Sequence, residues 1–131
     1  MAMDGLTRNR LNTLLIGLKC GGVENRGNYL QLVLGSRRLI VGAAWRVVHD
    51  DDIIIGSASE EEVLEKLPHI LIGQQIVGVT VSGAFNDLQL RFTQGILLEV
   101  FADSEKYEHW NVVGGPNEMI IAGPGRLWSS F

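Results

Sequence analysis

The sequence predicts a single α+β domain, mainly β, built from two copies of a unit made of a helix followed by an antiparallel β-meander. Three observations support this prediction. The 131 residues suffice for one hydrophobic core without disulfides or metals. Short sequence blocks recur in the same order in the two halves of the chain. Within each half, apolar residues at helical spacing are followed by apolar residues that alternate with polar ones.

Five blocks of the first half return in order in the second half, which places repeat 1 at about residues 4–56 and repeat 2 at about residues 57–131. The matched blocks are Leu15-Ile16-Gly17 with Leu71-Ile72-Gly73; Asn28, Leu30, Gln31 and Leu32 with Asn86, Leu88, Gln89 and Leu90; Leu39-Ile40 with Leu97-Leu98; Trp45, Val47 and Val48 with Trp110, Val112 and Val113; and Ile53, Ile54 and Gly56 with Ile120, Ile121 and Gly123. The shared order and the shared Trp indicate an internal pseudo-two-fold symmetry. Neither copy is large enough to bury its apolar sheet face alone, so we expect the two copies to form one domain.

Each copy is expected to begin with a helix. The first helix is indicated by four residues at helical spacing, Leu6, Leu11, Leu14 and Leu15. The second is expected within residues 57–69, where Ser59 and Glu62 have the spacing of a capping box and Pro68 is expected to end the helix.

Strands are expected after each helix because the period of the apolar residues changes to two. The alternating sets are Leu30, Leu32 and Leu34 in the first copy, and Val77, Val79 and Val81 with Leu88, Leu90 and Phe92 in the second. Glycine- and asparagine-containing segments between them favour chain reversals. The two resulting sheets pack face to face as a sandwich or join into a barrel-like sheet, and the sequence leaves both arrangements open.

Composition and charge exclude several classes of protein. Hydrophobic residues make up 46% and the net charge is −4, which argues against a disordered chain and against a nucleic-acid binder that neutralises phosphates. No apolar run reaches the length of a membrane span, and the first residues lack the apolar core of a signal peptide. Cys20 alone cannot form an intramolecular disulfide. We therefore expect a cytoplasmic protein that binds neither membranes nor nucleic acid.

Motifs that would indicate a metal, a cofactor or a nucleophile are absent from the sequence. The single Cys20 and the three histidines lack the spacing of a zinc site, and the run from His49 to Asp52 is interpreted as a solvated turn. Cys20 is interpreted as a small buried strand residue. No phosphate-binding or dinucleotide-binding glycine pattern occurs. We expect no metal and no cofactor.

The most distinctive segment is the polar stretch between Val100 and Trp110, where the spacing of the two copies changes by seven residues. Loops that differ between copies of a scaffold often carry function. The candidate partner-binding residues are Asp103, Glu105, Tyr107, Glu108, His109 and Trp110. Large aromatic side chains and carboxylates are suited to contact with a protein partner.

Two alternatives remain open at this point. In the first, Glu99, Glu108 and His109 act as acid and base in a hydrolytic or small-molecule site between the copies. Val41 stands at the position matched to Glu99, so these polar groups are additions to the shared unit. In the second alternative the protein is a homo-oligomeric scaffold, such as a homodimer, that associates through its exposed strand edges.

The second half also resembles a known family. Its Leu71-Ile72-Gly73 block, the alternating run Asp87–Phe92, the segment Tyr107-Glu108-His109-Trp110 and the pair Pro124-Gly125 are similar to the pattern of a bacterial domain-of-unknown-function family of small duplicated proteins. Some members of that family look like candidate immunity proteins that protect bacteria from toxins. The resemblance implies a non-enzymatic module that neutralises a protein toxin, with acidic residues such as Asp50 facing a basic nuclease. It gives no support to a mechanism based on His109.

Overall fold

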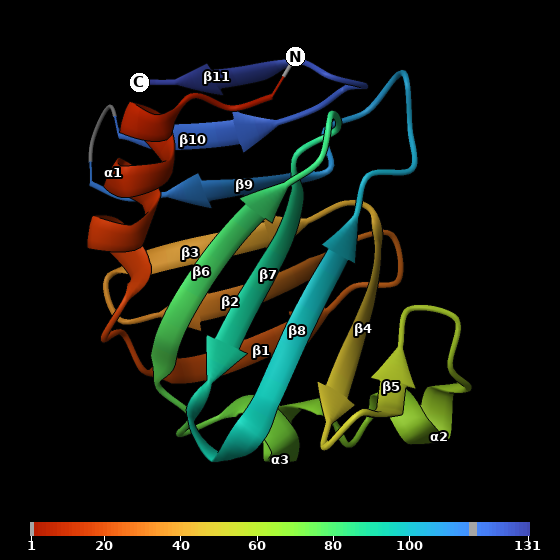
Figure 1. Cartoon of the computed structure of the whole chain (residues 1–131). Helices are drawn as coiled ribbons and strands as arrows, with labels where there is room; N and C mark the ends of the chain where they lie inside the picture. The colour runs from red at the N-terminus through yellow and green to blue at the C-terminus, as the bar shows by residue number, and fades with distance from the viewer. Residues whose placement is uncertain (1, 116–117) are drawn as a thin grey trace.

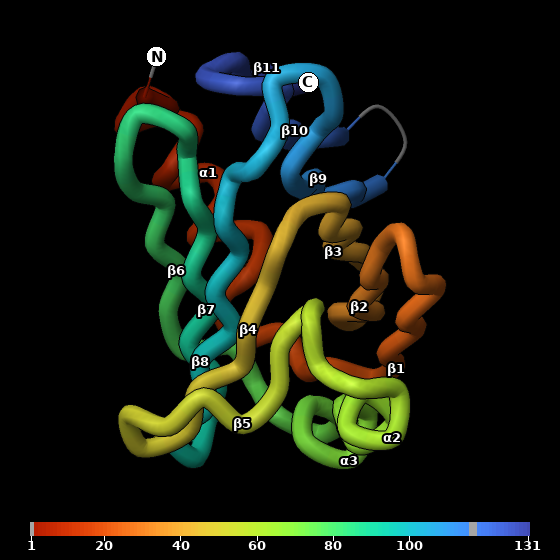
Figure 2. Tube along the Cα trace, turned by 90° about the vertical axis from the view of Figure 1, so that its right-hand side faces the viewer, coloured from red at the N-terminus to blue at the C-terminus, as the bar shows by residue number. Residues whose placement is uncertain are grey.

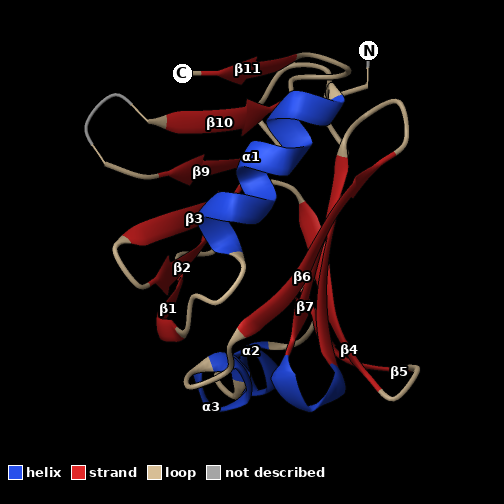
Figure 3. Ribbon diagram, turned by 60° about the vertical axis from the view of Figure 1, so that its left-hand side comes forward, coloured by secondary structure: helices blue, strands red, loops and turns tan. Residues whose placement is uncertain are grey.

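The computed structural model describes residues 2–115 and 118–131 and consists mainly of two antiparallel β-sheets (Figure 1). One sheet has the strand order β1 (Cys20–Asn25), β2 (Leu30–Leu34), β3 (Arg37–Val41), β9 (Trp110–Val113), β10 (Met119–Ala122) and β11 (Trp128–Ser130). The other has the order β5 (Asp52–Gly56), β4 (Ala44–His49), β8 (Ile96–Phe101), β7 (Asp87–Phe92) and β6 (Ile76–Ser82). The two sheets form two layers (Figure 3). Over the described residues no barrel closes, so of the two arrangements the sandwich is the one observed.

Each sheet combines strands from the two halves of the chain. Strand β3 pairs with β9, and strand β4 pairs with β8. The connection from β3 to β4 crosses from one sheet to the other, and the longer connection from β8 to β9 crosses back. The alternating residues of the strands face the space between the sheets, where Leu32, Leu90 and Trp110 are almost completely buried.

In residues 2–115 and 118–131, three α-helices lie at the sides of the sandwich. Helix α1 (Gly5–Leu15) contacts β6, and helix α3 (Leu67–Leu71) contacts β1. Helix α2 (Glu61–Leu64) lies near β5. None of the helices in the described part of the chain is long and apolar enough to cross a membrane.

The expected helices are only partly correct. Leu11 and Leu15 are buried as predicted, but Leu6 is 82% exposed, because only one narrow side of α1 faces the sheets. The helix expected within residues 57–69 is replaced by two short helices, α2 and α3. Pro68 lies in the first turn of α3 and does not end a helix, since a missing N–H costs nothing at that position. Ser59 does not cap α2, because its hydroxyl accepts a hydrogen bond from the Gly56 amide (2.9 Å).

Two of the matched blocks are out of register. Leu39 lies opposite Leu32, whereas the residue opposite Leu90 is Leu98, one position beyond the Leu97 that was matched with Leu39. The cause is the turn after β7, where Thr93–Gly95 is one residue longer than the turn between β2 and β3. A shift of one residue moves a side chain to the other face of a sheet. The residue in the register position of Glu99 is therefore Ile40 and not Val41.

The last block is displaced for a similar reason. Ile55 pairs with Val47 and is buried, as Ile120 pairs with Val112 and is buried, whereas Ile53 is 63% exposed. The extra residue of a bulge, Ile54, lies in β5 opposite the step from Val47 to Val48. The spacing of the apolar residues therefore could not show which of the three isoleucines 53–55 is buried.

The N-terminus of α1 provides a pH-dependent test. The Thr7 hydroxyl and then the Thr7 amide hydrogen bond to the Asp4 carboxylate and lower the pKa of that group below 3.8. The bond from the Thr7 amide is 2.7 Å long. Because the pKa is lowered in the folded state, this cap stabilises the fold above pH 3.8 and its contribution is lost as the pH falls through the folded-state pKa. Asp4→Ala should therefore lower the free energy of unfolding at pH 7, and the difference from wild type should shrink at low pH.

Urea unfolding of both proteins at neutral and acidic pH measures this difference. Asp4→Asn is the matched control, because its side-chain oxygen still accepts the amide hydrogen bond without titrating. An Asp4→Ala deficit that stayed constant down to the lowest pH at which the protein folds would contradict the assignment.

Candidate functional site

The candidate site is the connection between β8 and β9, residues 102–109, called here the 102–109 loop. It leaves the end of β8, projects from one corner of the sandwich and returns at β9 in the other sheet (Figure 1). Tyr107 is 70% exposed, and Asp103, Glu105 and Glu108 are also exposed. The loop therefore presents one aromatic ring and three carboxylates to solvent.

Hydrogen bonds hold the first part of the loop to its surroundings. The Ala102 amide donates to Asp87 Oδ1 (2.8 Å), and the Ala44 amide donates to Asp103 Oδ2 (3.1 Å). The Ser104 hydroxyl oxygen accepts hydrogen bonds from the amides of Lys106 and Tyr107, both 3.0 Å long. These bonds determine the direction of the turn that exposes Tyr107.

His109 holds the second part of the loop. Its ring Nε2 donates to the Ser104 carbonyl (2.8 Å), and its backbone amide donates to the Ala122 carbonyl (2.8 Å). The Gly42 amide donates to the His109 carbonyl (2.9 Å). A carbonyl only accepts hydrogen bonds, so Nε2 carries a proton. Among the described residues, nothing forms a hydrogen bond to His109 Nδ1.

The six candidate partner-binding residues therefore separate into two groups. Asp103, Glu105, Tyr107 and Glu108 face solvent, whereas His109 and Trp110 are each only 1% exposed. Trp110 is the first residue of β9, and its indole Nε1 donates to the Asn86 carbonyl (2.9 Å). His109 and Trp110 support the loop from the interior and present no surface to a partner.

The alternative acid-base site does not form. Glu99 lies on the face of its sheet that points away from the core, where its carboxylate accepts hydrogen bonds from Arg46 Nε and Gln89 Nε2, both 2.9 Å long. His109 lines a cavity of about 210 Å³ in which neither Glu99 nor Glu108 takes part. The alternation of side chains along β8 separates Glu99 from the core, and the 102–109 loop then carries His109 to the other sheet.

The other residues discussed in the sequence analysis have structural roles. His49 and Asp52 pair at the end of the β4–β5 hairpin, and Asp50 and Asp51 form its turn with positive φ, which confirms the predicted turn. Cys20 is 1% exposed at the start of β1, as predicted, and its burial raises the pKa of the thiol. In the described ranges, no three His, Cys, Asp or Glu side chains gather as a metal site would require.

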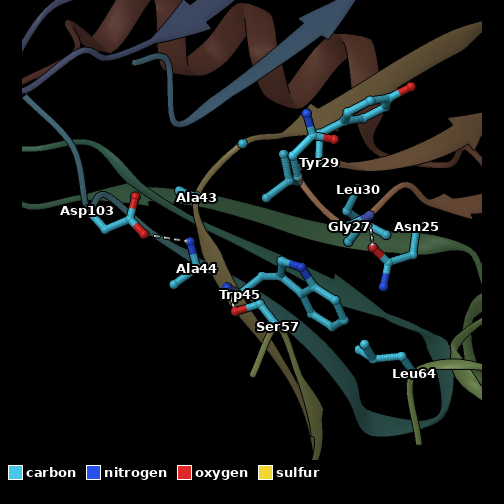
Figure 4. A pocket seen from close by; sticks show the side chains of 13 residues that line it. Asn25, Gly27, Tyr29, Leu30, Ala43, Ala44, Trp45, Ser57, Leu64 and Asp103 are labelled. Carbon is cyan, nitrogen blue, oxygen red and sulfur yellow. Dashed lines mark hydrogen bonds between the residues drawn. The ribbon is translucent and has the colours of Figure 1, made fainter. Parts of the chain in front are cut away.

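A groove beside Trp45 is not indicated by any pattern in the sequence. One cavity of about 280 Å³ and another of about 520 Å³ share Asn25, Gly27 and Leu64 in their walls and are therefore neighbours. Figure 4 shows the first of them. We call them together the Trp45 groove. Trp45 belongs to one of the repeated blocks of the sequence, but nothing in that pattern shows that its ring borders a cavity.

The chain was compared with models of protein families, with curated proteins and with solved structures, and none of them matches it.

Proposed function

We propose that this protein is a non-enzymatic binding module that recognises another protein through the exposed side of the 102–109 loop. The observation that carries the proposal is the combination of an exposed Tyr107 with a backbone held by hydrogen bonds from both sheets. A loop that is ordered before binding loses little conformational entropy on association. An exposed tyrosine then supplies a large rigid contact area.

The charge of the loop indicates a basic partner. Asp103, Glu105 and Glu108 surround Tyr107 in the sequence and are exposed, against the single Lys106. Complementary charge accelerates association and selects against other acidic proteins. We therefore propose a basic protein toxin as the partner and an immunity function for this chain.

The function is tested by affinity capture. The wild-type protein should recover a partner in stoichiometric amount from a lysate of the cells that produce it. The double variant Tyr107→Ala, Glu108→Ala should lose most of that partner, by about tenfold or more, because a central aromatic residue and a charge are removed together. Quantitative mass spectrometry of the captured proteins measures the loss.

The control is Leu6→Ala, which removes another exposed apolar side chain, on α1. It should capture as much partner as the wild type, and circular dichroism should show that all three proteins are folded. Equal capture by the double variant and the wild type, or no stoichiometric partner for either, would refute the function proposed for the loop.

We also propose that the two halves arose by duplication of one unit. In support, both helical segments that precede a first strand end in the same backbone geometry, with φ +94° at Gly17 and +91° at Gly73. The hydrogen bonds beyond these glycines are reciprocal: the Gly17 amide donates to the Ile76 carbonyl, and the Gly73 amide donates to the Cys20 carbonyl, both 2.8 Å long. The strand orders β1-β2-β3-β9-β10 and β6-β7-β8-β4-β5 also correspond.

A further inference from the structure

The Trp45 groove lies where the β1–β2 hairpin, β4 and α2 come together on one side of the molecule (Figure 2). Its first cavity is bordered by the crossing from β3 to β4, including Gly42, Ala43 and Ala44. The second cavity lies between the hairpin and the helices α2 and α3. The groove is therefore formed by segments from both sheets and is separate from the exposed Tyr107.

The floor of the groove is apolar. The Trp45 ring, which is 5% exposed, borders the first cavity, and Leu64 borders both. Val23 and Leu67 extend this surface into the second cavity. In Figure 4 the Trp45 indole lies on the side of the cavity toward Leu64, and Asp103 lies on the other side of Trp45. The groove offers an apolar contact of two to three side chains between its polar ends.

The position of Trp45 is fixed by its backbone. Its amide donates to the Ser57 hydroxyl (3.1 Å), and its carbonyl accepts a hydrogen bond from the Ser57 amide (2.9 Å). Asp103 is similarly fixed by the hydrogen bond from the Ala44 amide. These hydrogen bonds hold two walls of the first cavity in place, which reduces the cost of binding.

The charged residues that line the groove are all acidic. Asp103 lines the first cavity, and Glu61 and Glu65 line the second, so carboxylates stand on both sides of the shared wall. Among the described residues that border either cavity there is no Lys or Arg. The neighbouring Arg26 forms an ion pair with Glu24 (3.0 Å), so these two charges offset each other. A ligand with two cationic groups separated by an apolar group has the complementary pattern.

We propose that the Trp45 groove binds an extended basic segment of a partner protein, in which two Lys or Arg side chains flank an apolar side chain. The apolar side chain lies against Trp45 and Leu64, one cationic group lies near Asp103, and the other lies near Glu61 and Glu65. The apolar contact supplies affinity, and the exposed carboxylates supply selectivity and speed of association. The proposal rests on the proposed function in taking the partner to be a protein, but it uses different residues from the tip of the loop.

The test uses a short synthetic peptide with two lysines flanking a leucine, and a matched peptide in which glutamates replace the lysines. Isothermal titration calorimetry measures affinity, and two-dimensional NMR of the ¹⁵N-labelled protein reports the site through the Trp45 indole and Ala44 amide signals. The lysine peptide should bind and shift both signals, and the glutamate peptide should do neither. Failure of the lysine peptide to bind, or equal binding of both peptides, would overturn the proposal.

Two triple variants test whether the lysine peptide binds to the groove or to any acidic surface of the protein. Glu61→Gln, Glu65→Gln, Asp103→Asn removes the three lining charges and keeps an acceptor for the Ala44 amide. Glu60→Gln, Glu62→Gln, Glu105→Gln removes three charges from the same helix region and the same loop but from residues outside the groove walls, and Glu60 makes no side-chain capping bond. The first variant should bind the lysine peptide about tenfold or more weakly, and the second within about twofold of wild type. Equal weakening by both would refute the assignment to the groove.

Tyr107→Ala distinguishes this proposal from the function proposed for the loop. It should leave binding of the lysine peptide unchanged while it weakens capture of the protein partner. Loss of peptide binding in Tyr107→Ala would place the peptide on the loop and contradict the groove site.

Discussion

Trp110→Ala should destabilise the protein by about 3–5 kcal/mol, the usual cost of removing a fully buried large aromatic side chain. Trp110 is 1% exposed between the two sheets, at the point where β9 pairs with both β3 and β10. Its loss leaves a cavity in the core and removes the donor to the Asn86 carbonyl. Domains of this size are commonly stable by about 5–15 kcal/mol, so the variant is expected to lie close to the limit of folding. Urea unfolding followed by circular dichroism measures the change.

Trp110→Phe is the matched variant for the hydrogen bond. It keeps most of the apolar volume but removes the indole N–H, so we expect a smaller loss of about 1–3 kcal/mol. If Trp110→Ala cost no more than Trp110→Phe, the ring would not contribute to the core as its burial indicates.

Gly123→Ala is the second substitution with a large expected effect. Gly123 has φ +93°, and an added Cβ would lie 2.8 Å from the backbone nitrogen of His109 and 3.0 Å from its ring. The backbone strain and the clash together should cost about 2 kcal/mol or more. Because the His109 amide donates to the adjacent Ala122 carbonyl, the clash should also displace the end of the 102–109 loop. We therefore expect both lower stability in urea and weaker capture of the partner.

Gly125→Ala is the control from the same turn. Gly125 has φ +55°, a region that other residues reach more easily, and an added Cβ would meet nothing within 4 Å. Its cost should be about 1–2 kcal/mol, with no displacement of His109. Equal losses of stability and partner capture in the two variants would show that contact with His109 is not the cause.

The sequence was sufficient to predict the type of fold because side-chain alternation survives in β2 and β7. Leu30, Leu32 and Leu34 are all buried in β2, and Leu88, Leu90 and Phe92 are all buried in β7. The expected set Val77, Val79 and Val81 was wrong in part, because a bulge between Ile76 and Gly78 leaves Val77 53% exposed and buries Ile76 instead. Register was harder to predict, since it depends on turn lengths and bulges rather than on hydrophobicity. The three-residue turn at Thr93–Gly95 and the bulge at Ile54 in β5 were enough to misplace two blocks.

The candidate site was predicted in part for a similar reason. The polar stretch after β8 identified the loop, and Tyr107 and Glu108 are exposed as a partner contact requires. The pattern could not show that His109 turns inward, because its burial follows from hydrogen bonds to Ser104 and Ala122, which are formed only in the folded chain. The Trp45 groove was missed because its walls come from segments that are distant in sequence.

The mixing of strands from the two halves has a consequence for biosynthesis. When β3 and β4 have left the ribosome, the strands with which they pair at the centre of each sheet, β9 and β8, have not yet been made. One edge of β4 remains unpaired until β8 has been made, and one edge of β3 until synthesis has passed Val113 at the end of β9. Unpaired strand edges pair readily with other chains. The two ladders that join the halves of the chain thus form late and between distant residues, which slows folding. We therefore expect slower synthesis of the second half of the chain to increase aggregation of the nascent protein.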